Sequence, residues 1–282
     1  MNEMKWIGGL IALFVLASCD PTGTEPKVKE VDQPKIEGEK ISKLDQNLQV
    51  RDTLKMNNGI TIRWFKHGAG EGLVRGSVYF LDFKVMLDNG DVIDGNHLLK
   101  KDSIPFPMGF QMQGKGWDLA LAQLKLGDYV EIFLPSKWAR GDKEIKGLIP
   151  ANSNNTIKLR VLNKMKPTRV VDGSKVWVFE ENKENKLLFD DEEKITFHTM
   201  ISTPSKPRYV NTFAKNQPFE LKLEDYGTVP GLKKALINAK SSDRMLIYVP
   251  SREAYGNKGY LDVVKPNEDL LFNVMVMDVV KK

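Results

Sequence analysis

The stretch AYGNKGYLDVVKPNEDLLFNVMV (residues 254–276) decides how this sequence is interpreted. It opens with a tight turn, in which Tyr255 stands beside a glycine, and it closes with an apolar run typical of a strand. The turn occurs twice, because PSREAYG (250–256) matches PSKWARG (135–141) in its proline, serine, alanine and glycine. The central residue differs, since Arg140 takes the place of Tyr255. The two turns lie 115 residues apart (256 − 141 = 115). A repeat period of this length indicates two copies of a whole domain, because solenoid repeats are much shorter.

The same order of expected elements surrounds both turns. In the first half, alternating apolar residues predict strands at 59–65, 77–87, 129–134 and 156–162. A helix is expected over 116–128, just before the third of these strands. In the second half, a helix over 231–239 lies among strands at 194–201, 218–225, 244–249 and 270–280. A short linker is expected over 165–174. Strands around one short helix predict an α+β fold, a curved antiparallel sheet wrapped around a helix, in two tandem copies.

The N-terminus predicts export and a lipid anchor. Lys5 precedes the apolar run WIGGLIALFVLA (6–17), which is short for a membrane-spanning helix and typical of a signal peptide. The run ends in LASC, and Cys19 is the only cysteine of the chain. This pattern resembles the lipobox of bacterial lipoproteins, in which the thiol is acylated and the signal is cut before the cysteine. A plain secretory signal with a chance cysteine is the alternative.

These features divide the chain into four expected segments. They are a signal peptide (1–18), a lipidated Cys19 with a flexible polar tether (19–57), a first domain (58–166) and a second domain (167–282). The expected location is the bacterial cell envelope, with the protein anchored in a membrane. The choice between inner and outer membrane stays open.

Charge and histidine content argue against two classes of partner. The net charge is +5, but acidic and basic residues alternate along the chain, so no concentrated basic face for nucleic acid is expected. His67, His97 and His198 are isolated, with neither paired spacing nor neighbouring cysteines. Neither a metal site nor a cofactor is therefore expected.

Both halves resemble FKBP-type peptidyl-prolyl cis-trans isomerases, and the resemblance covers nearly everything from residue 59 to the end. The family pattern runs Ala-Tyr-Gly, Gly, Ile-Pro-Pro-Asn and then Leu-x-Phe-x-Val. The second half matches it in AYGNKGYLDVVKPNEDLLFNVMV, and the first in ARGDKEIKGLIPANSNNTIKLRV (139–161). The first half also carries the Pro-Phe, Gly-Trp-Asp and Leu-Gly-Asp series of the family.

The resemblance implies an apolar cleft between helix and sheet in each domain. In the first domain it implies the residues Phe83, Ile93, Asp94, Phe106, Gly114 (through its main chain), Trp117, Ile149 and Leu159. In the second it implies Phe197, Val210, Phe219, Val229 (through its main chain), Leu232, Tyr255, Val264 and Phe272. Each domain departs from the pattern. Arg140 replaces the family's tyrosine in the first domain, whereas Leu232, Asn211 and Lys265 replace a tryptophan, an aspartate and a proline in the second.

The activity implied is cis–trans isomerisation of X-Pro bonds in exported polypeptides, divided unevenly between the domains, so that one of them need not be active. Such a site needs neither a nucleophile nor a general base, because rotation about the amide breaks no σ-bond. Since both pockets depart from the pattern, a non-catalytic binding or chaperone lipoprotein is the alternative. Client proteins, the active domain and the oligomeric state stay open.

Overall fold

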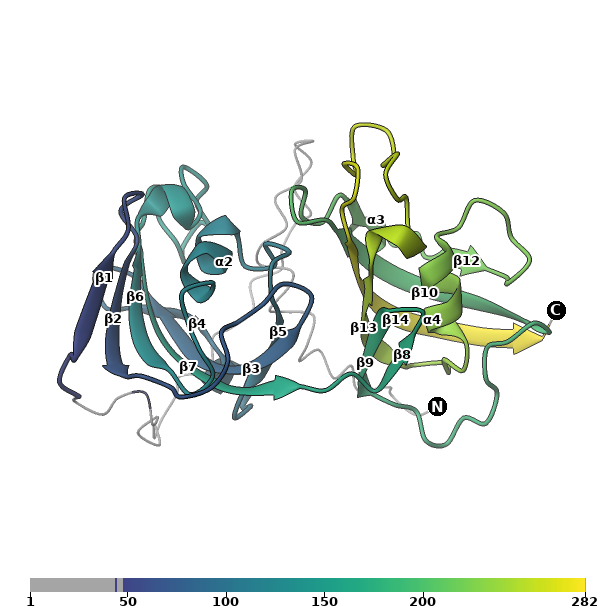
Figure 1. Cartoon of the computed structure of the whole chain (residues 1–282), viewed down its shortest axis with the longest axis horizontal. Helices are drawn as coiled ribbons and strands as arrows, with labels where there is room; N and C mark the ends of the chain where they lie inside the picture. Colours follow the sequence, from purple (N-terminus) through teal and green to yellow (C-terminus); the bar gives the residue numbers. More distant parts are fainter. Residues whose placement is uncertain (1–43, 45–47, 282) are drawn as a thin grey trace.

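The computed structural model describes Leu44 and residues 48–281, and its chain forms two antiparallel sheets of seven strands each (Figure 1). The predicted signal peptide, Cys19 and most of the predicted tether lie outside this part of the chain. Each sheet curves around one helix, with a separate hydrophobic core between helix and sheet. The predicted tandem α+β fold is therefore confirmed.

The first sheet has the strand order β1 (Asp52–Lys55), β2 (Thr61–Lys66), β6 (Tyr129–Leu134), β7 (Asn155–Met165), β3 (Val78–Met86) and β4 (Val92–Gly95), and β5 (Ile104–Pro107) also pairs with β3. Alternate residues of β3 point to the core, where Leu81 and Phe83 are fully buried. Helix α2 (Lys115–Leu121) buries Trp117 and Leu121 against the same face.

The second sheet has the order β11 (Val210–Asn211), β10 (Glu193–Ser202), β14 (Leu270–Lys281), β13 (Arg244–Val249), β9 (Ser174–Glu180) and β8 (Arg169–Val171), with β12 (Phe219–Leu221) paired to β10. Helix α4 (Pro230–Leu236) covers its core face and starts with a proline at the first turn, where no amide donor is needed. A short helix, α3 (Thr212–Lys215), follows β11.

The repeated turn has the same backbone geometry in both copies. It forms the 3-10 helices η3 (Ser136–Trp138) and η4 (Ser251–Glu253). The amide of Gly141 donates to the Ser136 carbonyl over 2.7 Å, and that of Gly256 donates to the Ser251 carbonyl over 2.8 Å. The loops that follow also close alike, through bonds in both directions between Ile145 and Ile149 in one copy and between residues 260 and 264 in the other.

Both helices end earlier than the sequence pattern predicts, α2 at Leu121 and α4 at Leu236. A continuing α2 would need the Lys125 amide to donate to the Leu121 carbonyl. That amide instead donates to the Asp128 carboxylate over 2.8 Å. In the second domain the Lys240 amide likewise donates to Asp243 over 2.9 Å. In both domains the aspartate thus fixes the turn that leads from the end of the helix into the next strand.

Two boundaries also differ from the expectation. Strand β1 lies within the segment predicted as tether, because the turn at 56–59 folds Asp52–Lys55 back onto β2. The segment predicted as a linker contains β8, which pairs with β9 through Asp172 and Gly173. Both turn residues have positive φ (50° and 84°), the conformation of a two-residue hairpin turn. The Asp-Gly pair is thus a hairpin signal.

Asp128 is expected to contribute strongly to stability. It is buried and accepts three hydrogen bonds, from the amides of Gly68 and Lys125 and from the indole of Trp64. Asp128→Ala leaves these donors unpaired, so we expect the free energy of unfolding to fall by about 3 kcal/mol or more. Urea unfolding of the full chain measures this change. The exposed Asp102→Ala is the control, and equal losses in both variants would contradict the prediction.

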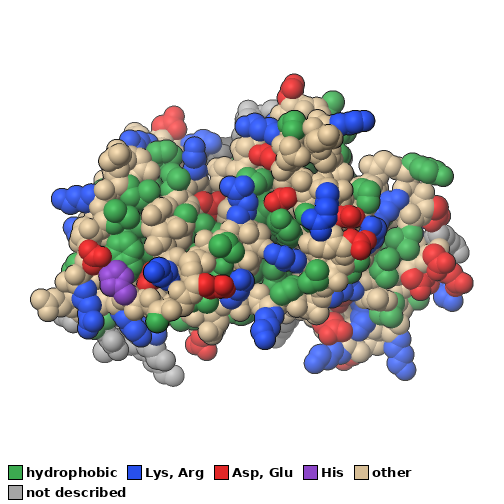
Figure 2. All heavy atoms as spheres, viewed as in Figure 1, with side chains coloured by type: hydrophobic (Ala, Val, Ile, Leu, Met, Phe, Trp, Pro, Cys, Tyr) green, Lys and Arg blue, Asp and Glu red, His purple; other side chains and the backbone are tan. Residues whose placement is uncertain are grey.

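The surface carries mixed charge over the face seen in Figure 2, where lysine and arginine side chains lie among aspartate and glutamate. Within the described residues, no helix is long and apolar enough to cross a membrane.

Candidate active site

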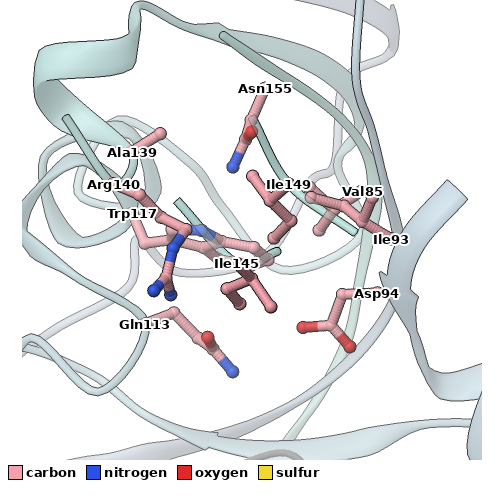
Figure 3. A pocket seen from close by; sticks show the side chains of 10 residues that line it. All are labelled: Val85, Ile93, Asp94, Gln113, Trp117, Ala139, Arg140, Ile145, Ile149 and Asn155. Carbon is pink, nitrogen blue, oxygen red and sulfur yellow. The ribbon is translucent and has the colours of Figure 1, made fainter. Parts of the chain in front are cut away.

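A cleft opens in the first domain between the start of α2, strand β4 and the loop after η3. It encloses about 80 Å³ and is lined by Val85, Ile93, Asp94, Gln113, Trp117, Ala139, Arg140, Ile145, Ile149 and Asn155 (Figure 3). Six of these ten residues are apolar and come from helix, sheet and loop, and the other four are polar. This is the composition of a site that binds a small apolar group and orients it by a few polar contacts.

Trp117 lies in the cleft wall and is held by two aromatic neighbours. Phe83 meets it edge-on, with ring centroids 5.2 Å apart, and Phe106 lies almost parallel to it at 5.9 Å. Aromatic pairs of this kind contribute about 0.5–1.5 kcal/mol each beyond burial. The indole therefore has a fixed orientation before any ligand arrives.

The close approach of α2 to the repeated turn depends on Gly116. A Cβ at this position would lie 2.3 Å from the Trp138 carbonyl oxygen. The matching glycine of the second domain, Gly231, is also confined, and a Cβ there would lie 2.5 Å from a methyl of Val249. In both domains the glycine lets the helix start sit directly against the η3 or η4 segment.

The structure brings the predicted first-domain residues together at different depths. Ile93, Asp94, Trp117 and Ile149 line the cleft, whereas Phe83 and Phe106 support Trp117 from behind. Leu159 has no exposed surface and belongs to the core beneath. The sequence reasoning did not select Val85, Gln113, Ala139, Ile145 or Asn155. Val85 was within reach of the pattern, because it follows Phe83 on the same face of β3.

Gly114 precedes α2 with a positive φ of 105°, which favours glycine. Its amide was expected to bond a substrate carbonyl, but in this structure it donates to the Gln111 carbonyl over 3.0 Å. The predicted main-chain donor is thus already paired. Gln113, one residue earlier, is the residue of this loop whose side chain reaches the cleft.

Two side chains of the first cleft, Asp94 and Arg140, carry opposite charges. Figure 3 shows the Asp94 carboxylate and the Arg140 guanidinium on opposite sides, with Gln113 beside Arg140. Asp94 accepts the Gly95 amide over 2.7 Å, and Arg140 donates to the Lys143 carbonyl over 3.4 Å. Burial raises the pKa of Asp94, and the bond from Gly95 and the nearby His97 offset this only in part.

Asp94→Asn is expected to stabilise the folded protein modestly at neutral pH. Because burial raises the pKa of Asp94 in the folded state, the folded chain binds this proton at a pH where the unfolded chain has released it. The charged carboxylate therefore destabilises the folded state above both pKa values, and this effect vanishes as the pH falls below the ordinary value of about 3.9. Unfolding free energies of both proteins between about pH 4 and pH 7 test this. A wild type more stable than the variant at neutral pH would contradict it.

The second domain gathers its predicted residues around the start of α4. Phe197, Val229, Leu232, Val264 and Phe272 are buried in one cluster, and the half-buried Val210 and Tyr255 pack against it. Phe219 is 42% exposed and meets Phe197 edge-on, with ring centroids 6.1 Å apart. All eight therefore lie in one region, with Phe219 at its rim.

The second domain has three neighbouring tyrosines in this region, where the first cleft has the charged Asp94 and Arg140. Tyr255 stacks on Tyr260 at 4.7 Å between ring centroids, and Tyr209 lies close enough to be affected by both. Burial raises the pKa of Tyr209 and of Tyr255, so both hydroxyls stay protonated at neutral pH. Tyr209 and Tyr260 were not predicted from the sequence.

Asn211 has a structural role where the family carries an aspartate. Its side-chain oxygen accepts the amides of Phe213 and Ala214 and thereby caps α3. An aspartate could cap α3 in the same way, so the structure does not explain why asparagine stands here.

In the part of the chain that the structure describes, no group of three or more histidine, cysteine, aspartate or glutamate residues could hold a metal ion.

The comparisons with known proteins agree with this geometry. The family model described as FKBP-type peptidyl-prolyl cis-trans isomerase matches residues 70–162 and 188–277, one segment in each sheet. The two segments make up more than half of the chain, so the chain belongs to this family.

Individual relatives are distant. FK506-binding protein 4 of Emericella nidulans is 29% identical over 140 residues, which cover 50% of this chain and 28% of that protein. The peptidyl-prolyl cis-trans isomerase Mip of Coxiella burnetii is 23% identical over 188 residues, which cover 66% of this chain and 80% of that protein. The match spans less than a third of the length of several relatives, and only 15% of human FKBP9. The crystal structure of the three FKBP domains of wheat FKBP73 has 19% identity and a TM-score of 0.40, covering 80% of this chain and 97% of that chain.

Proposed function

We propose that this protein is a peptidyl-prolyl cis-trans isomerase whose catalytic site is the cleft of the first domain. The observation that carries the proposal is Trp117, a flat indole fixed by Phe83 and Phe106 in the wall of an open apolar cleft. Its face suits a pyrrolidine ring, and Ile93 and Ile149 enclose the ring from other sides.

The cleft acts by binding the twisted amide more tightly than either planar form. The barrier to rotation, about 18–20 kcal/mol, is the resonance energy lost when the amide leaves planarity. A planar amide is more polar than a twisted one, so apolar walls disfavour the planar forms. Lowering the barrier by roughly 5 kcal/mol would accelerate rotation by three to four orders of magnitude.

Polar groups orient the substrate. Arg140 occupies the place of the family's tyrosine, and its guanidinium supplies N–H donors for carbonyl oxygens next to the proline. Asp94 lies across the cleft and accepts N–H groups of the substrate backbone. The two charges thus fix the direction of the bound chain.

In our proposal the second domain binds client segments more than it turns them over. Leu232 offers less flat apolar surface than a tryptophan. The exposed aromatic rings of Phe219, Tyr226 and Tyr260, with the exposed Leu261, provide contacts for an unfolded chain. Single exposed apolar residues are common, but these four belong to β12 and the loops that flank α4 and follow η4.

The experiment is a measurement of cis–trans exchange in a short Leu-Pro peptide by NMR with the full chain. We expect acceleration well above the uncatalysed rate, and a similar rate with Leu232→Ala, which truncates the second-domain residue that corresponds to Trp117. Peptide binding without acceleration would favour the non-catalytic alternative. A large loss of activity in Leu232→Ala, with the second domain still folded, would move catalysis to the second domain.

We further propose that the protein is attached to a membrane of the bacterial cell envelope through acylated Cys19, with clients among exported proteins. The lipobox-like LASC after a short apolar run supports this, since stable anchoring needs more than one acyl chain. Cys19→Ser is expected to move the protein from the membrane fraction to the soluble fraction after cell breakage. A variant that stays in the membrane fraction after a salt wash would contradict the anchor.

A further inference from the structure

One loop of the first domain joins the cleft to the second domain. We call residues 108–114 the cleft loop. Gln113 lines the cleft, and the loop leads directly into α2, which carries Trp117. The shape of this loop therefore sets where the polar Gln113 and the start of α2 lie relative to a bound peptide.

The three residues before Gln113 all contact the second domain. Phe110 is fully buried and meets the ring of Tyr248 edge-on at 6.2 Å. The Gln111 side-chain amide donates to the Pro204 carbonyl over 2.7 Å. Met112 is 2% exposed, and its sulfur accepts the hydroxyl of Ser202 over 3.9 Å. Three consecutive residues of the cleft loop therefore pack against or bond to the second domain.

The second sheet has an apolar outer face that receives the loop. Trp177 of β9, Leu246 of β13 and Leu271 of β14 are at most 2% exposed and form a third cluster with Val78, Phe110 and Met112. These three residues alternate along their strands with residues of the inner core, so both sheet faces are apolar here. Figure 1 shows β9 and β13 on the side of the second sheet that faces the first domain. The junction is therefore packed like a core.

The other side of the cleft loop is fixed within the first domain. The Asp118 carboxylate of α2 accepts the amides of Gly109 and Gln111, over 3.3 and 2.7 Å. Gln111 has a φ of 53°, a left-handed conformation that costs about 1 kcal/mol or more for a residue with a Cβ. Such a conformation persists only when surrounding contacts impose it. Asp118 supplies one of these contacts and the Pro204 carbonyl supplies another.

We infer that the second domain positions the cleft loop of the first, so that Gln111 and Leu246, which do not line the cleft, act as positioning residues for peptide binding there. The inference rests on the proposed function, since it gives the second domain a part in peptide binding by the first. Its physical content is that loss of the junction lets the cleft loop relax and displaces Gln113.

The test uses the full-length protein with isoleucine methyl groups labelled for NMR. Ile93, Ile145 and Ile149 report on the first cleft, and Ile195, in the core of the second domain, reports whether that domain stays folded. A short Leu-Pro peptide is titrated into the wild type, Leu246→Ala and Gln111→Asn. Asparagine tolerates the left-handed backbone but is too short to reach Pro204.

We expect both variants to shift the cleft methyl signals of the free protein and to raise the dissociation constant of the peptide about 3- to 10-fold. The rise should appear in KM more than in kcat. Leu246→Met should restore wild-type values, and Met277→Ala, an exposed position at the far end of β14, should leave them unchanged.

Unchanged methyl positions and affinity in both variants, with Ile195 unaffected, would overturn the inference. If Leu246→Ala unfolds the second domain, Gln111→Asn alone decides. If the wild type does not bind the peptide, the proposed function fails, while the methyl positions of the free variants still test the positioning role.

Discussion

Replacing Trp117 by leucine is expected to lower kcat/KM for a Leu-Pro peptide roughly 30- to 150-fold, which corresponds to about 2–3 kcal/mol of transition-state stabilisation. The second domain carries a leucine, Leu232, at this position, so the variant gives the first cleft the matching residue of the second domain. The loss arises because the flat indole and its contacts with Phe83 and Phe106 disappear together. The fold should survive, since leucine fills part of the same space.

Trp117→Phe is the graded control and should lose less than Trp117→Leu, because it keeps an aromatic face. Leu232→Trp is the reciprocal variant, and any gain of activity would show what the indole contributes. Activity of Trp117→Leu within about threefold of the wild type would contradict the assignment of catalysis to the first cleft.

Gly116→Ala is expected to lower the free energy of unfolding by about 3 kcal/mol or more and to reduce activity as well. The added methyl would lie 2.3 Å from the Trp138 carbonyl oxygen, and a backbone atom cannot rotate away as a side chain can. The start of α2 must therefore move, and Trp117 moves with it. Urea unfolding and the isomerase assay measure both effects.

Gly72→Ala is the matched control, because the nearest atom to an added Cβ is 3.8 Å away. Gly231→Ala should cost less than Gly116→Ala, since its two nearest neighbours are side-chain atoms of Val249 and Glu253. If Gly116→Ala unfolds at the same urea concentration as Gly72→Ala, the close approach is not required.

The fold could be predicted because its signals are local. Alternating residues in β3 and β7 mark one buried sheet face, and the repeated turn marks the duplication. The helix ends could not be read from periodicity, because Leu124 and Leu126 continue an apolar pattern beyond the last helical residue. After Leu121 the amides of Gln123 and Leu124 donate to the carbonyls three residues back, and the Lys125 amide donates to Asp128.

The cleft could be predicted in part. Ile93, Asp94, Trp117 and Ile149 were predicted from the family resemblance, position by position, and all four line the cleft. Gln113 and Ile145 were missed because the family residues carried onto the first domain do not include them. Both also lie outside the helices and strands, where periodicity gives no direction for a side chain. Gly114 lies where it was expected, but its amide is paired with Gln111.

The domain junction has a signal in the sequence, but a search for alternating apolar and polar residues does not detect it. The runs VWVF (176–179) and MLIYV (245–249) are apolar at consecutive positions, the pattern of strands buried on both faces. The strand YVEIFL (129–134) of the first domain places Glu131 outward instead. Comparing the two halves strand by strand thus indicates which sheet has a covered outer face.

The most direct test of the central claim is a titration of the full-length wild type with a Leu-Pro peptide, followed at the isoleucine methyl groups and by cis–trans exchange of the same peptide. The account predicts that Ile93, Ile145 and Ile149 shift in a saturable way and that the exchange rate rises in proportion to their occupancy. Accelerated exchange without any shift of these three methyl groups would contradict it.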